Sequence, residues 1–208
     1  MLIHNLEEQL PDLKKHAFLT SSQKLHFRNL RDSLILEDNF NTAVMQIDYA
    51  ENFAIHQQRE IQSAYFVNNQ ISIFTCVVWH GNSALFFALI SDDLNHDKFS
   101  VFANMYEIAS FIQYKFPAIN CVHIYSDGAS SQFKNRFSLS AIKIIAALFN
   151  FKMCWHFFST SHGKGAADGI GATVKSLAWR LMKSETANIN NACTFAKALD
   201  GKCNVNII

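Results

Sequence analysis

The stretch CVHIYSDGASSQFKNR, residues 121–136, decides the fold of this 208-residue chain. Its first five residues, Cys121 to Tyr125, form an apolar run of strand length, and Asp127 follows before Gly128 and a polar segment. A carboxylate at the end of a buried strand contributes little to packing, because charged side chains are rarely buried without a partner. Asp127 is therefore the first candidate for a functional residue.

Two further aspartates have comparable settings. Asp48 closes the run of residues 43–47, and Asp168 lies in the glycine-rich segment of residues 162–169. Carboxylates on strand and helix ends are suited to hold hard divalent cations. Asp168 has a second interpretation, since a carboxylate at the start of a helix also caps it.

The composition is that of one domain with a short extra arm. Half of the residues are hydrophobic, and the chain has 19 Phe but 2 Pro, which suits a substantial core of regular elements. The longest apolar runs are far shorter than the roughly 18 residues of a membrane span, and the first residues lack the pattern of a signal peptide. We therefore expect an intracellular protein without membrane contact.

The cysteine pattern argues against a disulfide framework or a structural zinc site, because 5 Cys lie at wide spacings without a Cys-x-x-Cys pair. Buried, reduced thiols are the expected state. Cys154, His156 and His162 could be ligands of a soft metal, but no second pair accompanies them, and a histidine in an aromatic strand usually belongs to the core.

Charge is unevenly distributed, although the formal net charge is +1. Residues 128–183 contain eight Lys or Arg and one acid, whereas residues 48–107 contain seven acids and two bases. The basic half fits a polyanionic partner, and it fits equally well the solvated faces of ordinary helices.

Apolar periodicity predicts a helical arm over residues 5–34, interrupted at Pro11, and strands at 42–48, 71–80 and 83–90, the last two joined by a hairpin turn. Helices are predicted at 97–115, 130–150 and 170–182, and strands at 121–125 and 151–158. The near-continuous apolar character of the last strand predicts a central, buried position. The expected division is an arm (1–40), a core (41–185) and a C-terminal tail (186–208).

This order of elements brings the three aspartates together. The first three strands can pair antiparallel, and the fourth and fifth can add in parallel to the first through right-handed crossovers, giving an α/β fold with a mixed five-stranded sheet. Asp48 and Asp127 then lie side by side, and the last helix carries Asp168 toward them. Three clustered carboxylates suit two-metal phosphodiester chemistry with Mg²⁺ or Mn²⁺.

Four segments resemble the conserved blocks of eukaryotic transposon-derived proteins with a DDE/D-type, RNase H-like transposase core: residues 47–52, 90–94, 125–136 and 155–171. The last two blocks are long and specific. The resemblance implies an RNase H-like fold and a cut-and-paste DNA transposase, with Asp48, Asp127 and Asp168 as the catalytic, metal-binding acids. It further implies DNA as the partner, a homo-oligomer, and a nuclear location.

Transposases of this kind carry a separate DNA-binding region upstream, so we expect a fragment or a shortened, domesticated copy. The alternative function is a catalytically silent fold that binds DNA or another protein. Contacts to DNA are expected from polar side chains near Asp127 and Asp168, namely Gln132, Lys134, Asn135, Arg136, His162 and Lys164.

Other features have structural interpretations. Asp92, Asp93 and Asp97 precede a helix and are expected to cap it or to lie in a solvated loop, although one of them could replace Asp168 as a metal ligand. Glu51 could support the metal ligands from a distance. Trp179 is expected to pack in the core. The Gly-Lys-Gly segment at 163–165 lacks the phosphate-loop pattern, so no nucleotide cofactor is expected.

Overall fold

The computed structural model describes residues 2–36, 40–55, 69–159 and 165–208. No helix in these ranges combines the length and the apolar character that a membrane crossing requires. The elements in chain order are α1 (Leu2–Leu36), β1 (Thr42–Ala54), β2 (Gln70–His80), β3 (Ser83–Ser91), α2 (Lys98–Lys115), β4 (Cys121–Ser126), α3 (Arg136–Phe149), β5 (Lys152–Phe157), α4 (Ala166–Lys183), α5 (Ala192–Leu199) and β6 (Asn206–Ile207).

One mixed sheet organises the fold, with the strand order β5-β4-β1-β2-β3-β6. β1, β2 and β3 form an antiparallel meander, and β4 and β5 add in parallel on the other side of β1. The α/β fold with a mixed sheet predicted from the sequence is confirmed, including the adjacency of its first and fourth strands. One detail differs, because β6 pairs in parallel with β3 and gives the sheet a sixth strand.

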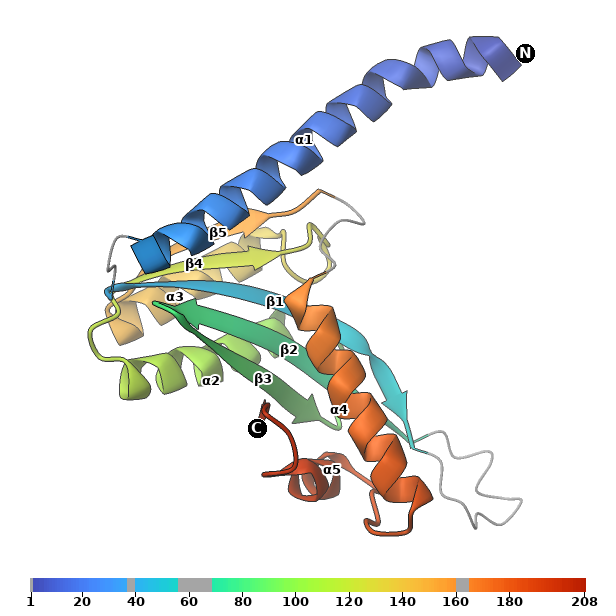
Figure 1. The fold of residues 1–208 in the computed structure, drawn as a ribbon, viewed down its shortest axis with the longest axis vertical. Coiled ribbons are helices and arrows are strands. Elements are labelled where there is room, and N and C mark those ends of the chain that lie inside the picture. The colour runs from blue at the N-terminus through green and yellow to red at the C-terminus, as the bar shows by residue number, and fades with distance from the viewer. Residues whose placement is uncertain (1, 37–39, 56–68, 160–164) are drawn as a thin grey trace.

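Helices cover both faces of the sheet (Figure 1). α2 and α3 pack on the face that carries Met45 and Ile47, whereas α4 and α5 pack on the other face. α1 lies across the sheet on the α4 side (Figure 1). Because successive side chains of a strand point to opposite faces, Gln46, Asp48 and Ala50 lie on the face covered by α4.

α1 is one continuous helix of 35 residues, so the prediction that Pro11 interrupts it was wrong. Its C-terminal half packs on the sheet, where Phe27 meets Tyr125 and Phe158 edge-on and Leu34 is 1% exposed. Its N-terminal half extends away from the sheet (Figure 1). The docked half is therefore held by side chains that face β1, β2 and β4 and the residue that follows β5.

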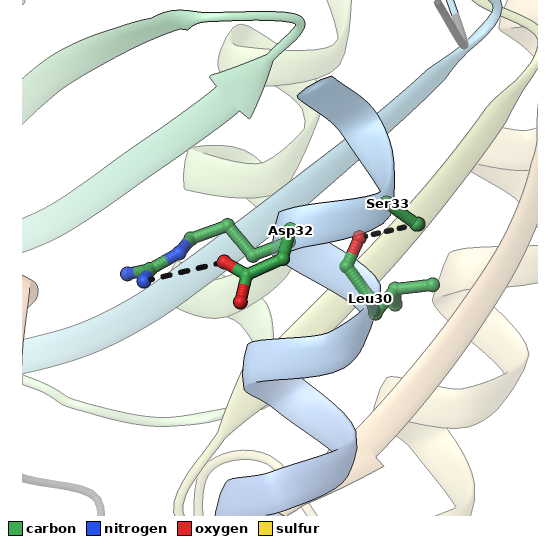
Figure 2. A network of polar contacts seen from close by, with 4 residues as sticks. Leu30, Asp32 and Ser33 are labelled. Carbon is green, nitrogen blue, oxygen red and sulfur yellow. Dashed lines mark hydrogen bonds and ion pairs between the residues drawn. The ribbon is translucent and has the colours of Figure 1, made fainter. Parts of the chain in front are cut away.

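Figure 2 shows the polar contacts in the last turns of α1. Ser33 Oγ donates to the Leu30 carbonyl (2.8 Å), and Arg31 Nη2 lies 3.8 Å from Asp32 Oδ1. Both charged side chains of this pair are about half-exposed to solvent, so the pair contributes little to stability. The Arg31 guanidinium also lies 5.9 Å from the ring centroid of Trp79, which ties the helix to β2.

Several predicted boundaries differ from the structure. The hairpin of β2 and β3 is confirmed, with Gly81 at φ +54° in its turn, but β1 continues beyond residue 48 to Ala54, with an irregularity after Ala50. α3 begins at Arg136 instead of residue 130, because Asn135 caps it. α4 begins at Ala166, before the predicted start at 170.

β5 is an edge strand of the sheet, next to β4, so the prediction of a central strand was wrong. Its side chains are half-buried because helices cover both of its faces. Trp155 belongs to the cluster with α2 and α3, and His156 lies against His26 of α1. An edge strand covered in this way has the same apolar sequence pattern as a central one.

Residues 186–208 fold against the sheet. α5 buries Phe195 and Leu199 in the cluster that also contains Ile170 of α4, and Phe195 contacts Phe53 of β1 edge-on at a centroid distance of 5.4 Å. The Ala192 N–H at the start of α5 donates to Asp92 Oδ1 (2.7 Å). The segment predicted as a tail thus belongs to the core of the sheet.

Candidate active site

Asp48 lies on β1 between Val44, which packs against α1, and Ala50, which packs against α4. Its Oδ1 accepts a hydrogen bond from the Tyr49 N–H (2.8 Å), and its carbonyl oxygen accepts one from Thr75 Oγ1 (3.0 Å). Burial, together with the charges of Asp127 and Asp168, raises the pKa of Asp48 to about 6, against the opposite effect of the Tyr49 N–H. The ionised form of this carboxyl group is therefore destabilised unless a cation neutralises the site.

Asp127 follows directly after β4 and neighbours Asp48. The parallel register pairs Gln46 with Tyr125, and Asp48 and Asp127 each lie two residues further along their chain segments. Asp127 Oδ1 accepts a hydrogen bond from the Ala129 N–H (3.1 Å), which fixes the carboxylate at the start of the following turn.

Asp168 is exposed in the first turn of α4. Its Oδ2 accepts a hydrogen bond from the Gly165 N–H (2.9 Å), so the capping role considered from the sequence is confirmed. Its charge also contributes to the raised pKa of Asp48. The Asp168 carboxylate therefore both caps α4 and adds to the negative charge around Asp48.

Small residues hold α4 close to β1. A Cβ on Gly171 would lie 2.8 Å from the Ala50 Cβ, and a Cβ on Gly165 would lie 2.8 Å from Gln46 Nε2. Gln46 is 4% exposed, two residues before Asp48. Gln46 and Gly171 were not predicted as site residues, although a lone amide in the apolar run of residues 43–47 is a signal for the first.

The charges of Asp48, Asp127 and Asp168 influence one another, but their carboxylate oxygens are not positioned to coordinate a metal ion. Within the described ranges, no three Asp, Glu, His or Cys side chains are positioned to hold a metal ion as they stand. The donor chemistry nevertheless fits Mg²⁺ or Mn²⁺, because these ions prefer carboxylate oxygens. A bound cation would also remove the repulsion that raises the pKa of Asp48.

Two of the predicted DNA-contacting residues are exposed cations in the segment that follows Asp127. A Cβ on Gly128 would lie 4.0 Å from Lys134 Cδ, so the Lys134 side chain runs beside the residue that follows Asp127. Its Nζ lies 5.6 Å from the centroid of the Phe157 ring. Arg136 is exposed at the start of α3. Both charges are accessible to an anionic partner.

The other predicted contacts have structural roles or lie outside the described residues. Asn135 Oδ1 accepts from the N–H groups of Phe137 and Ser138, and its Nδ2 donates to the carbonyls of Ser130 and Gln132. Gln132 is half-buried in this turn. His162 and Lys164 lie outside the described residues.

The acids before α2 have the expected structural roles. Asp97 Oδ1 accepts from the N–H groups of Phe99 and Ser100 and caps α2. Asp93 Oδ1 accepts from the Asn95 N–H within the loop (3.0 Å). The capping and loop interpretations are therefore confirmed.

Glu51 and Trp179, one on β1 and one on α4, are both exposed. Glu51 is exposed on β1, and its charge opposes the effect of burial, which lowers the pKa of Lys175. Trp179 is 54% exposed, with Lys183 Nζ 5.0 Å from its ring centroid, so the prediction that it packs in the core was wrong. Trp179 lies on the outer face of α4.

The model of the family described as Domain of unknown function (DUF8701) matches residues 23–208. The chain belongs to this family. Among curated proteins, none matches the DUF8701 chain.

Two solved structures are similar to the DUF8701 chain. One is a chain of the simian T-cell lymphotropic virus intasome in complex with PP2A regulatory subunit B56 gamma, with 11% identity, a TM-score of 0.47, and coverage of 75% of this chain and 46% of that one. The other is the Mos1 transposase paired-end complex with left transposon end, with 10% identity, a TM-score of 0.41, and coverage of 89% and 58%. The DUF8701 chain thus spans about half of the length of these solved chains.

Proposed function

We propose that this protein is a DNA transposase-like catalytic domain, which cleaves and transfers DNA strands with Mg²⁺ or Mn²⁺ held by Asp48, Asp127 and Asp168. The observation that carries the proposal is the placement of Asp48 beside Asp127, with Asp168 near enough for its charge to help raise the pKa of Asp48. Asp127 follows the neighbouring parallel strand, and Asp168 belongs to the first turn of α4. The sequence blocks that resemble a DDE/D-type transposase core include the same three residues.

In this proposal, each aspartate has a separate role. Asp48, on β1 between β4 and β2, would share in holding the cations with Asp127 and Asp168. When bound there, the cations would activate the attacking oxygen and stabilise the leaving oxygen. The Tyr49 and Ala129 N–H groups orient Asp48 and Asp127 before any substrate arrives.

DNA is the proposed substrate because accessible positive charge lies in the segment that follows Asp127. Lys134 and Arg136 are exposed, and we assign both to phosphates of the DNA backbone. Contacts of this type weaken as salt concentration rises, because binding releases counterions from the DNA. Replacement of both residues by Ala should therefore weaken DNA binding and flatten its dependence on salt, while Lys14→Ala/Lys15→Ala on the projecting arm should change neither.

The deciding experiment measures nicking of a supercoiled plasmid by the full chain, with Mg²⁺ or Mn²⁺ and with a chelator. Asp127→Asn should abolish nicking, since the amide keeps an acceptor for the Ala129 N–H but loses the negative charge. Asp93→Asn, at an exposed loop position before α2, is the matched control and should retain activity. Equal nicking by the wild type and Asp127→Asn would refute the catalytic assignment. Salt-dependent binding without any nicking would instead favour the catalytically silent alternative.

A further inference from the structure

Gln46 is a buried polar side chain on the sheet face that carries Asp48. It is 4% exposed and lies in the otherwise apolar run of residues 43–47. Burial of an amide costs free energy unless hydrogen bonds offset the cost, so an apolar side chain would serve packing alone at least as well. The contacts of Gln46 therefore indicate a role other than packing.

The Gln46 amide lies against the residue that precedes α4. A Cβ on Gly165 would lie 2.8 Å from Gln46 Nε2 and 3.0 Å from Gln46 Oε1, so a side chain does not fit beside this amide as it stands. Gly165 has an extended φ of −172°, which other residues also adopt, so the backbone itself does not require glycine there. The requirement comes from the contact with Gln46.

Gly165 in turn contacts Asp168. The Gly165 N–H donates a hydrogen bond to Asp168 Oδ2 (2.9 Å) at the start of α4. The Asp168 carboxylate is thus connected to β1 through the backbone of Gly165. Any shift of Gly165 relative to Gln46 moves the hydrogen-bond partner of this carboxylate.

Two close contacts between α4 and β1 lie on either side of Asp48. The contact at Gly165 involves the β1 residue two positions before Asp48, and the contact of Gly171 with Ala50 involves the residue two positions after it. Asp168 lies midway between the two glycines in the sequence. Because a helix held at two points cannot slide along the strand, these contacts determine where Asp168 lies relative to Asp48.

We propose that Gln46 is a positioning residue, which holds Gly165, and through it Asp168, in place beside the strand that carries Asp48. This inference rests on the proposed function, and it adds a residue that touches neither the DNA nor the cations. Gln46 acts only through the packing of its amide against Gly165. Reaction rates depend steeply on such placement, because a misplacement of about 1 Å can cost about 10²-fold.

The first measurement is the pKa of Asp48 in the full chain without divalent cations, from the pH dependence of its carboxyl carbon NMR shift. Gly165→Ala should displace the start of α4 and lower this pKa, as Asp168→Asn should, because the Asp168 charge contributes to its elevation. Gln46→Ala/Gly165→Ala should lower it by less than the sum of the two single changes, because the shorter side chain leaves room for the added methyl group. Gly169→Ala is the matched control and should leave it unchanged, since no atom lies within 4 Å of its added Cβ.

Plasmid nicking gives a second readout. Gly165→Ala should lower the rate by about ten- to a hundredfold and raise the Mn²⁺ concentration required for half-maximal rate. The double variant should regain much of both, with unchanged circular dichroism in every chain. A Gln46 side chain that only filled space would change stability without this rescue.

The two proposals can fail separately. An unchanged pKa of Asp48 in Gly165→Ala, or additive effects of the Gln46 and Gly165 substitutions on that pKa, would refute the positioning role. Absence of nicking in the wild type would refute the proposed function alone, because the pKa measurement does not depend on catalysis.

Discussion

At the level of single residues, Asp48 and Asp97 show how surroundings give one side chain opposite pKa shifts. The backbone N–H groups of Ser100 and Phe99 stabilise the Asp97 carboxylate and lower its pKa. Burial and two neighbouring aspartates raise that of Asp48. The cap at Asp97 depends on the next three residues and was predictable from the local sequence. The pKa of Asp48 depends on β4 and α4, which only the fold brings close.

Replacement of Asp48 by Asn should stabilise the folded protein at neutral pH. The pKa of Asp48 is about 6 in the folded protein and 3.8 as its reference value, so the folded state binds more protons between these values and stability falls as pH rises through the window. Above it, the ionised side chain costs about 1–2 kcal/mol, less than the full shift implies because solvent reaches this half-buried group. Urea unfolding of the wild type and Asp48→Asn at about pH 3 and about pH 7.5 measures the difference in the free energy of unfolding. The same difference at both pH values would contradict the prediction.

Replacement of Asp97 by Ala should have the opposite pH dependence. The variant loses the cap of α2 and about 1 kcal/mol of stability at neutral pH. Because the pKa of Asp97 is lowered, this contribution is present above its usual titration range and disappears as pH falls through the folded pKa. Thermal unfolding of the wild type, Asp97→Ala and Asp97→Asn checks it. Asn retains the acceptor, so a full loss in Asp97→Asn would argue against the cap.

At the level of elements, the close approach of α4 to β1 sets the position of Asp168. Gly171→Ala would bring two Cβ atoms to 2.8 Å, so the helix must move away from Ala50 at a cost of about 1–3 kcal/mol. Gly169→Ala is the matched control on the same helix, because no atom lies within 4 Å of its added Cβ, and it should gain up to about 1 kcal/mol of helix stability. Denaturant unfolding of both variants measures the change in the free energy of unfolding, which should be negative for Gly171→Ala and positive for Gly169→Ala. Equal stability of the two variants would show that α4 is not held by this contact.

The elements that could be predicted from sequence are those whose signals are local. The β2–β3 hairpin, α2 with its Asp97 cap, and the neighbouring positions of β1 and β4 followed from turn residues, caps and connection rules. The errors concern features set by distant contacts. β5 is an apolar edge strand because α1 and α3 cover it, and Trp179 is exposed because α4 turns that position outward. Pro11 lies inside α1, where local rules predict an interruption.

At the level of the whole molecule, one face of the sheet is covered in two parts, by α1 over one part and by α4 and α5 over the other. Val44 of β1 belongs to the cluster with Leu34 of α1, and Ala50 packs with the cluster of α4 and α5. Between these positions, the β1 side chains on the same face are Gln46 and Asp48. The polar group of the candidate active site therefore lies where one apolar covering ends and the other begins. The position of this boundary depends on both α1 and α4, which are distant from Asp48 in the sequence. The residues around Asp48 alone therefore did not predict it.

The C-terminal segment should prove to be part of the cooperative fold. Phe195 of α5 is 0% exposed and packs against Phe53 of β1, so Phe195→Ala should cost about 3–5 kcal/mol. Phe18 on the projecting half of α1 is 71% exposed, and Phe18→Ala should cost less than about 0.5 kcal/mol. Calorimetry and far-UV circular dichroism of both variants should each give a single transition, with a lowered midpoint for Phe195→Ala alone. A separate early transition in that variant would mean that α5 and β6 unfold independently, because a shared core requires the sheet and the C-terminal segment to melt together.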